Sequence, residues 1–384
     1  MAAAPSHSPA GPSWVPGDHI IAALAPYLSF ADHLVHRIVC RAWRHSCHLI
    51  GRRPPPFPWL MLPPPPPPAP APGTPQRRVF YDIPGGRSYA YPVPASYRYL
   101  ASRGGWLVLA ASDPPRRIVV LNPITNGQVD VSWPFGEGEE PTEGGFHAVM
   151  TASLVDPACF LAVAKDRVVK YCRPAAGRAG GWVTLHAQGF RFDAARSDLV
   201  SVGTTVYLVD GRRKLWRADL VATEPKVERR DTAFELPGGE AWRHYLVESL
   251  GHVLLVVSDE HHQRLGLYSL NWGARMWVPT PASGIGDTVL LLGRGCSAAV
   301  PASAAAGHSP GTVLAVRQPW RWSSVHMGLN FCRGQPWFWT ASRLGAGLGD
   351  HQLALKKTVP QRPGEFITGD SFWFFPAIDE SGCP

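Results

Sequence analysis

The N-terminal part of the chain carries apolar residues at helical spacing. A first apolar stripe repeats every three or four positions and consists of Ile20, Ile21, Leu24 and Leu28. Pro16 suits the first turn of a helix, because proline lacks the N–H that this turn leaves unbonded. Ser29 can cap a second helix, whose apolar stripe runs from Leu34 to Trp43. The pattern predicts two or three short helices over residues 13–52, a unit of marginal stability unless it binds a partner.

Beyond residue 79 the helical spacing is replaced by short apolar runs that Gly, Pro, Asn and Asp separate. Runs such as GGWLVL and RRIVVL are typical of strands, and Asn126-Gly127 is typical of a hairpin turn. Trp133, Trp182 and Trp277 fall in or near the last strand of three groups and lie 49 and 95 residues apart. A four-stranded group every roughly 40–50 residues is typical of a β-propeller blade. The pattern therefore predicts an all-β propeller of roughly six blades.

A proline-rich segment over residues 53–78 joins the two regions. Its apolar centre, Trp59 to Leu62, is predicted to be a short packed strand that begins the propeller, since such side chains favour burial. The prolines from Pro63 onward predict an extended polyproline II loop, with a ligand for an SH3-like domain as the alternative. Residues 1–12 are rich in Ala, Pro and Ser and are predicted to be disordered.

The composition favours a turn-rich β protein over a helical bundle, since it includes 38 glycines and 40 prolines. The formal charge of +8 comes from scattered arginines, which favours a solvated surface over a nucleic-acid site. The 7 cysteines form no CxxC pair, which indicates reduced thiols in the cytoplasm and/or the nucleus. The N-terminus has no secretory signal, and the apolar runs are too short to span a bilayer. We therefore expect an intracellular protein with no membrane partner.

Four patterns suggest chemistry, and each has a simpler interpretation. They are the His and Cys residues between His33 and His48, the Gly293-x-Gly295 pattern, the acidic run from Glu137 to Glu143 and the pair His261-His262. The His and Cys residues lack the repeated ligand spacing of a structural zinc site. The Gly293-x-Gly295 pattern is not followed by the helix of a dinucleotide site and favours a strand–turn–strand. The last two are typical of an exposed loop and a hairpin tip. We predict no catalytic residue, no metal site and no cofactor.

The N-terminal unit resembles an F-box. The resemblance rests on Pro16, on the first apolar stripe and on the ending Val39-Cys40-x-x-Trp43. An F-box binds the Skp1 subunit of an SCF ubiquitin ligase, so the resemblance implies a Skp1-like partner and, through it, a cullin. The residues that it implies for this contact are Pro16, Ile20, Leu24, Val39, Cys40 and Trp43. Leu24 and Val39 have a second interpretation, as residues that only hold the small unit together.

The rest of the chain resembles the KIB-type β-propeller of plant F-box proteins. The matching stretches are PWLMLP, FYDIPGG, GGWLVL, LNPITN, GDTVLLLGRGCSAAV and SFWFFPAI. The part after residue 300 departs from the family's pattern, which predicts an atypical last part of the domain. The resemblance implies a multidomain α+β fold class. A small all-α F-box of two to three helices over residues 13–52 would precede an all-β propeller over residues 79–384.

This combination implies the substrate-receptor subunit of an SCF-type E3 ubiquitin ligase. Its propeller would recruit a target protein, and the ligase core would supply the chemistry, so the chain itself is expected to be no enzyme. One sequence does not predict which residues bind the target. Two alternatives stay open. One is a propeller interaction protein whose F-box does not assemble a ligase, and the other is an enzyme or small-ligand binder that uses the propeller channel.

Overall fold

The computed structural model describes most of the chain between residues 58 and 316, together with several shorter segments. The described residues are 18–24, 28, 32, 58–62, 77–83, 85–94, 96–111, 113–136, 145–193, 197–230, 243–258, 265–293, 295–304, 308–316, 337–341, 354–358, 372–374 and 376. The chain divides into two compact units, Met1–Pro56 and Phe57–Pro384.

Within its described residues, the first unit contains one α-helix with defined bounds, α1 (Asp18–Leu24). Ile20 and Leu24 lie one turn apart on it, as the first apolar stripe predicts. Their side chains are nevertheless 37% and 44% exposed, so these two residues of the stripe are not buried. The predicted α+β fold class, with an all-α domain over residues 13–52, is wrong, because the structure described is nearly all β. An apolar stripe of two turns is too little evidence for a helical domain, because a helix this short is stable only when its apolar face is buried.

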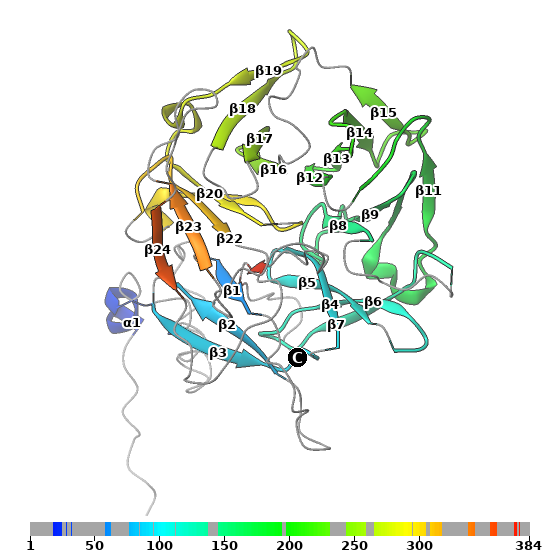
Figure 1. The fold of residues 1–384 in the computed structure, drawn as a ribbon. Coiled ribbons are helices and arrows are strands. Elements are labelled where there is room, and N and C mark those ends of the chain that lie inside the picture. Colours follow the sequence, from blue (N-terminus) through cyan, green and yellow to red (C-terminus); the bar gives the residue numbers. More distant parts are fainter. Residues whose placement is uncertain are drawn as a thin grey trace, which may run out of the picture. The chain divides into compact units, whose positions relative to one another are not determined.

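The described residues of the second unit form six sheets, arranged as blades around a common centre (Figure 1). The first three sheets have the following strands. Blade 1 contains β25 (Phe372–Phe374), β1 (Trp59–Met61), β2 (Arg78–Asp82) and β3 (Arg87–Tyr91). Blade 2 contains β4 (Arg98–Arg103), β5 (Trp106–Ala111), β6 (Arg117–Leu121) and β7 (Gln128–Ser132). Blade 3 contains β8 (His147–Met150), β9 (Leu161–Lys165), β10 (Val168–Cys172) and β11 (Val183–His186).

The remaining three sheets complete the ring. Blade 4 contains β12 (Asp198–Val202), β13 (Thr205–Val209), β14 (Leu215–Asp219) and β15 (Val227–Arg230). Blade 5 contains β16 (Arg243–Ser249), β17 (His252–Ser258), β18 (Leu265–Asn271) and β19 (Met276–Pro279). Blade 6 contains β21 (Ala298–Pro301), β20 (Thr288–Leu292), β22 (Val313–Val316), β23 (Trp337–Ala341) and β24 (Ala354–Thr358). The predicted propeller of roughly six blades is confirmed.

Apolar layers between neighbouring blades make up the core. Such layers join blade 2 to blade 3, blade 3 to blade 4, blade 4 to blade 5 and blade 5 to blade 6. Strand β5 is buried at every position, because neighbouring structure covers both faces of its sheet. Near the centre of the propeller, blades 2 to 5 contact one another through β4, β8, β12 and β16. Each of these strands is the first of its blade, so the ends at which the four strands begin lie on one face of the propeller.

The propeller closes in blade 1, where strands from both ends of the unit pair. β25 pairs with β1 in an antiparallel register that places Trp59 opposite Phe374. The Trp59 ring stacks on Tyr89 with centroids 4.9 Å apart, and the Phe80 ring meets Phe374 edge-on at 5.1 Å. The prediction that residues 59–62 pack as a short strand is confirmed by β1 and by the burial of all four side chains. The polyproline loop predicted after it lies outside the described residues.

Blade 6 differs from the other blades in its connectivity. Its sheet has five strands and includes a parallel pair, β20 and β22. A turn joins β20 to β21 and contains Gly295 with a φ of 65°. The Gly293-x-Gly295 pattern is therefore part of a strand–turn–strand, as predicted. In this turn Cys296 is hydrogen-bonded to the hydroxyl of Tyr99 on β4, so blade 6 reaches the inner strand of blade 2.

The recurring tryptophans lie at the outer edges of their blades. Trp133 follows β7, Trp182 precedes β11 and Trp277 lies within β19, so their predicted positions in or near last strands are confirmed. The indole N–H of Trp182 donates to the carbonyl of Ser132 at 2.9 Å, which ties blade 3 to blade 2. Asn126 has a φ of 60° and lies in the connection between β6 and β7, where the sequence predicts a hairpin turn.

Candidate functional site

The structure describes two of the six residues that the F-box resemblance implies for a Skp1 contact. Ile20 and Leu24 lie on α1 at a spacing of four residues, which places them on the same helix face. Both are exposed, so α1 offers an apolar face to solvent. The other four lie outside the described residues and are Pro16, Val39, Cys40 and Trp43.

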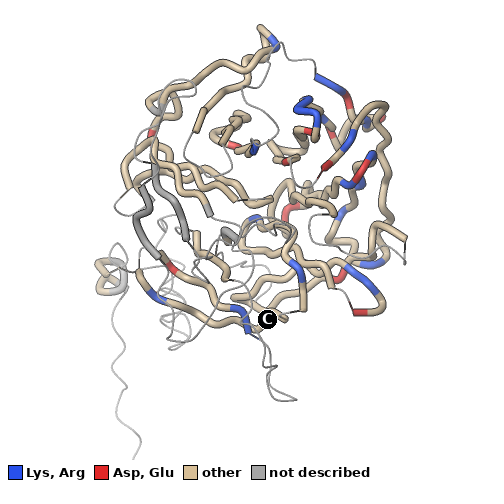
Figure 2. Tube along the Cα trace, in the orientation of Figure 1, with Lys and Arg blue, Asp and Glu red and all other residues tan. Residues whose placement is uncertain are grey.

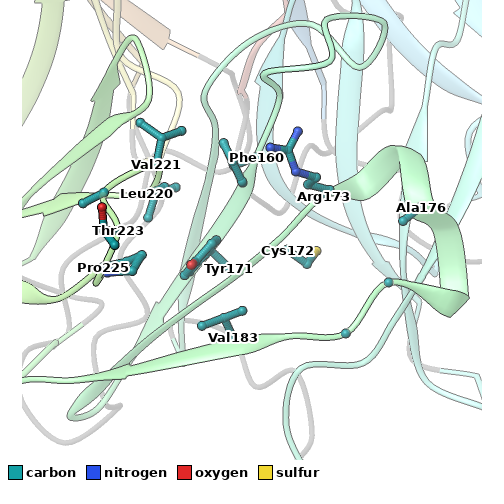
Figure 3. A pocket seen from close by; sticks show the side chains of 13 residues that line it. Phe160, Tyr171, Cys172, Arg173, Ala176, Val183, Leu220, Val221, Thr223 and Pro225 are labelled. Atoms are coloured by element: carbon teal, nitrogen blue, oxygen red, sulfur yellow. The ribbon is translucent and has the colours of Figure 1, made fainter.

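An open groove with a volume of about 600 Å³ lies between blades 3 and 4 of the propeller (Figure 3). One side is built from the end of β10 and from the short 3₁₀ segment η2 (Pro174–Ala179). The other side is the connection between β14 and β15, which includes Val221 and Pro225. The start of β11 completes the lining at Val183. The groove therefore depends on the packing of two blades against each other.

An aromatic pair and an arginine form one wall of this groove. The rings of Phe160 and Tyr171 meet edge-on with their centroids 5.8 Å apart. The guanidinium of Arg173 lies 4.6 Å from the centroid of the Phe160 ring, and it also donates a hydrogen bond to the carbonyl of Pro157. A cation over an aromatic face is held in place by the ring quadrupole. Arg173 therefore presents a positioned positive charge beside an apolar surface.

Two exposed valines flank the groove. Val183 is 46% exposed and Val221 is 57% exposed. A single exposed valine is ordinary on a protein surface, and here two share one groove and give it an apolar rim. The sequence holds no signal for this feature. Val183 belongs to β11 and Val221 is the second residue after β14, and their exposure is decided by how the neighbouring blade covers them.

The groove also reaches the outer strand of blade 3. β11 is the terminal strand of its sheet and pairs with β10. Three of its residues, Val183, Thr184 and His186, are exposed, whereas Leu185 is buried. An outer strand with an open edge can pair with an extended segment of another protein, and an adjacent apolar groove can then accept that segment's side chains.

The thiols at and near the groove are poor nucleophiles. Burial, followed by the influence of Cys159, raises the pKa of Cys172 to about 12. Burial also raises the pKa of Cys159 to about 11. Because the thiolate is the reactive form of cysteine, both side chains stay protonated and unreactive at neutral pH. These two thiols therefore favour a structural role in the propeller core over a catalytic one.

We expect iodoacetamide at pH 8 to leave Cys159 and Cys172 unmodified in the folded chain and to modify both in urea. The ordinary pKa of these thiols is 9.0, and folding raises it. The stability that they contribute is therefore fully present below about pH 9 and is lost as the pH rises through about 11 and 12. Mass spectrometry of digested peptides measures the modification. Rapid labelling of Cys172 in the folded chain at pH 8 would contradict its placement.

A buried polar cluster lies where the inner strands of blades 3, 4 and 5 begin. His147 of β8, Asp198 of β12 and His244 of β16 are all buried. One oxygen of Asp198, Oδ2, accepts the backbone N–H of Leu246 at 2.8 Å, and the other, Oδ1, lies 4.0 Å from Nδ1 of His147. The carboxylate therefore contacts the blades on both sides of its own. We interpret this cluster as a link that holds the inner ends of three blades together.

Two further observations concern only the residues that the structure describes. Among these residues, no three His, Cys, Asp or Glu side chains gather closely enough to hold a metal ion. No described helix has the length and apolar character needed to cross a membrane. The His- and Cys-rich segment 33–48, the acidic run 137–143 and the pair His261-His262 lie outside the described residues.

Comparison with protein families gives one match. The family model of the KIB1-4 beta-propeller matches residues 80–325, which is more than half of the chain. The matched range begins in β2 and ends beyond β22, so it takes in blades 2 to 5 completely. This match supports the KIB-type propeller that the sequence predicts. No curated protein matches the chain significantly.

Comparison with solved structures gives matches of low similarity. The allergen Mala s 1 of Malassezia sympodialis is 9% identical, with 73% of this chain and 87% of that chain covered and a TM-score of 0.35. The Aleuria aurantia lectin is 9% identical, with 75% and 94% covered and a TM-score of 0.33. The dihydro-heme d1 dehydrogenase NirN is 13% identical, with 76% and 53% covered and a TM-score of 0.32. This chain thus spans about half the length of NirN. These matches carry no argument about function.

Proposed function

Because the chain belongs to the KIB1-4 beta-propeller family, we propose that it is the substrate-receptor subunit of an SCF-type ubiquitin ligase. The observation that carries the proposal is the combination of this propeller with an N-terminal segment that resembles an F-box and ends in Val39-Cys40-x-x-Trp43. In this role the chain is a non-catalytic adaptor. Its N-terminal segment binds a Skp1-like protein, and its propeller binds the protein to be ubiquitinated, in the cytoplasm and/or the nucleus.

The exposed face of α1 supports the Skp1 contact. Ile20 and Leu24 present two apolar side chains on one helix face, and a partner with an apolar groove would bury both. Burial of apolar surface is the main source of affinity in such helix-in-groove contacts. Pro16, Val39, Cys40 and Trp43 are proposed to contribute to the same contact.

The groove between blades 3 and 4 supports the recruitment of a target. It combines exposed Val183 and Val221 with the positioned charge of Arg173, beside the open edge of β11. An extended segment of a target could pair with that edge and place apolar side chains in the groove. The groove has the features of a binding surface, which is what an adaptor requires.

Capture of purified Skp1 by the full-length chain tests the adaptor role. The wild-type chain is expected to bind Skp1, and Trp43→Ala or Pro16→Ala is expected to weaken binding at least about tenfold, since aromatic anchors dominate such interfaces. Surface plasmon resonance measures the affinity. Trp272→Ala serves as the matched control, because Trp272 is 46% exposed on the propeller and should not affect this contact. Failure of the wild-type chain to capture Skp1 would refute the adaptor role.

A further inference from the structure

One end of blade 4 carries a concentration of positive charge (Figure 2). We call it the blade 4 basic cluster, and its members are Arg191, Arg212, Arg213, Lys214, Arg229 and Arg230. Figure 2 shows Lys and Arg positions gathered around β14 and β15. The six cations come from three separate parts of the chain: the segment before β12, the turn between β13 and β14, and the end of β15.

The sheet register brings these three parts together. Arg230 at the end of β15 pairs with Leu215 at the start of β14, so the end of β15 lies beside the turn between β13 and β14. The backbone N–H of Gly211 in this turn donates to the carbonyl of Arg191 at 3.1 Å. Asp198 pairs with Val209, which places this end of the blade on the face where the inner strands begin. The six residues therefore gather at one end of the blade, with Arg229 and Arg230 on opposite faces of its sheet.

Asp210 fixes the turn that presents three successive cations. Its side chain is almost fully buried, with 1% exposed. One carboxylate oxygen accepts the backbone N–H groups of Arg212 and Lys214 at 2.9 and 2.8 Å. The other accepts the indole N–H of Trp216 at 2.9 Å. Because the turn is held through the backbone and a buried carboxylate, the exposed side chains of Arg212 and Lys214 have no part in holding it.

The cluster has fewer negative than positive charges among its described residues. Glu228 accepts a hydrogen bond from Arg230 at 2.8 Å and also lies 3.3 Å from Lys226. Asp210 is buried beneath the turn, and the third nearby carboxylate belongs to Asp193. Asp166, whose carbonyl accepts the N–H of Phe192, and Asp198, which pairs with Val209, also lie near this end of the blade. Four of the six cations are exposed, against one of these five carboxylates, so the outer surface is mainly positive. Opposite charge on a partner would be attracted to this surface and oriented by it.

We propose that the blade 4 basic cluster binds an acidic segment of the target protein, one rich in Asp and Glu side chains. This inference rests on the proposed function, since it specifies the chemistry of the protein that the propeller recruits. Arginine suits such a partner, because its guanidinium forms paired hydrogen bonds with a carboxylate. Single-stranded nucleic acid fits less well, because it requires exposed aromatic rings for base stacking. Trp216 is 3% exposed and bonded to Asp210, and the exposed Trp272 packs against Tyr207 with ring centroids 5.4 Å apart.

Fluorescence anisotropy of a labelled poly-glutamate peptide with the full-length chain tests this proposal. The wild-type chain is expected to bind the peptide more tightly than a poly-glutamine peptide, with an affinity that falls as salt is added. The double variant Arg212→Gln/Lys214→Gln is expected to bind about tenfold more weakly. Arg77→Gln/Arg275→Gln is the matched control, because it removes two exposed cations from blade 1 and from the connection before β19, and its affinity is expected to be unchanged.

Three results would overturn the proposal. The first is that the wild-type chain does not bind poly-glutamate. The second is that both double variants weaken poly-glutamate binding equally. The third is that the wild-type chain binds a labelled single-stranded RNA more tightly than poly-glutamate and that Arg212→Gln/Lys214→Gln abolishes this RNA binding. Skp1 capture by the same preparations separates this proposal from the adaptor role. A chain that captures Skp1 but ignores poly-glutamate would refute the acidic target alone, whereas the reverse result would refute the adaptor role alone.

Discussion

Replacement of Phe374 by alanine is expected to lower the free energy of unfolding by about 4 kcal/mol. Phe374 is fully buried, and its ring contacts Trp59 and Phe80 with centroids 6.4 and 5.1 Å away. These contacts join the C-terminal strand β25 to the N-terminal strands of blade 1. Loss of the phenyl group leaves a cavity at the point where the propeller closes, so the loss of stability affects all the blades. Urea unfolding followed by tryptophan fluorescence measures it.

Val155→Ala is the control for this measurement. Val155 is 51% exposed, so its truncation is expected to change the free energy of unfolding by less than about 0.5 kcal/mol. If Phe374→Ala were no more destabilising than Val155→Ala, closure of the propeller through β25 would be wrong.

Replacement of Asp198 by leucine is expected to lower the free energy of unfolding by about 3 kcal/mol. Its carboxylate accepts the backbone N–H of Leu246 in blade 5 and lies beside His147 in blade 3. Leucine is similar in size but offers no acceptor, so the buried N–H of Leu246 would lose its partner. Asp198→Asn keeps an acceptor oxygen at nearly the same place and is expected to cost only about 1 kcal/mol.

Thermal and urea unfolding of the two Asp198 variants distinguish a link between blades from a ligand site. A link predicts a large difference in stability between the leucine and asparagine variants. Equal stability of Asp198→Leu and the wild-type chain would show that the carboxylate has no role in joining the blades. That result would favour the alternative in which the polar cluster serves a ligand in the channel.

Blades 2 to 5 could be predicted from the sequence because each one forms from four consecutive strands. Apolar runs separated by turn residues such as Asn126-Gly127 predict these strands locally. The tryptophan spacing also predicts the repeat, since Trp133 and Trp182 occupy similar places at the edges of successive blades. The apolar runs and turns that predict these strands reflect contacts between residues that are close in sequence.

Features that depend on distant parts of the chain could not be predicted in the same way. The pairing of Phe374 with Trp59 joins opposite ends of the propeller unit, and no local pattern specifies it. The groove at Val183 and Val221 results from the packing of one blade on the next. The error in fold class has the opposite cause. Ile20 and Leu24 follow a helical pattern, but the pattern does not reveal that both side chains stay exposed.

Affinity purification of the full-length chain, with quantitative mass spectrometry under proteasome inhibition, tests the adaptor role most directly. The wild-type chain is expected to co-purify Skp1, a cullin and at least one further protein that accumulates as ubiquitin conjugates. Trp43→Ala is expected to lose Skp1 and the cullin but to keep that protein, whereas Val183→Asp/Val221→Asp is expected to lose that protein alone. A wild-type chain that brings down neither Skp1 nor a cullin would contradict the account.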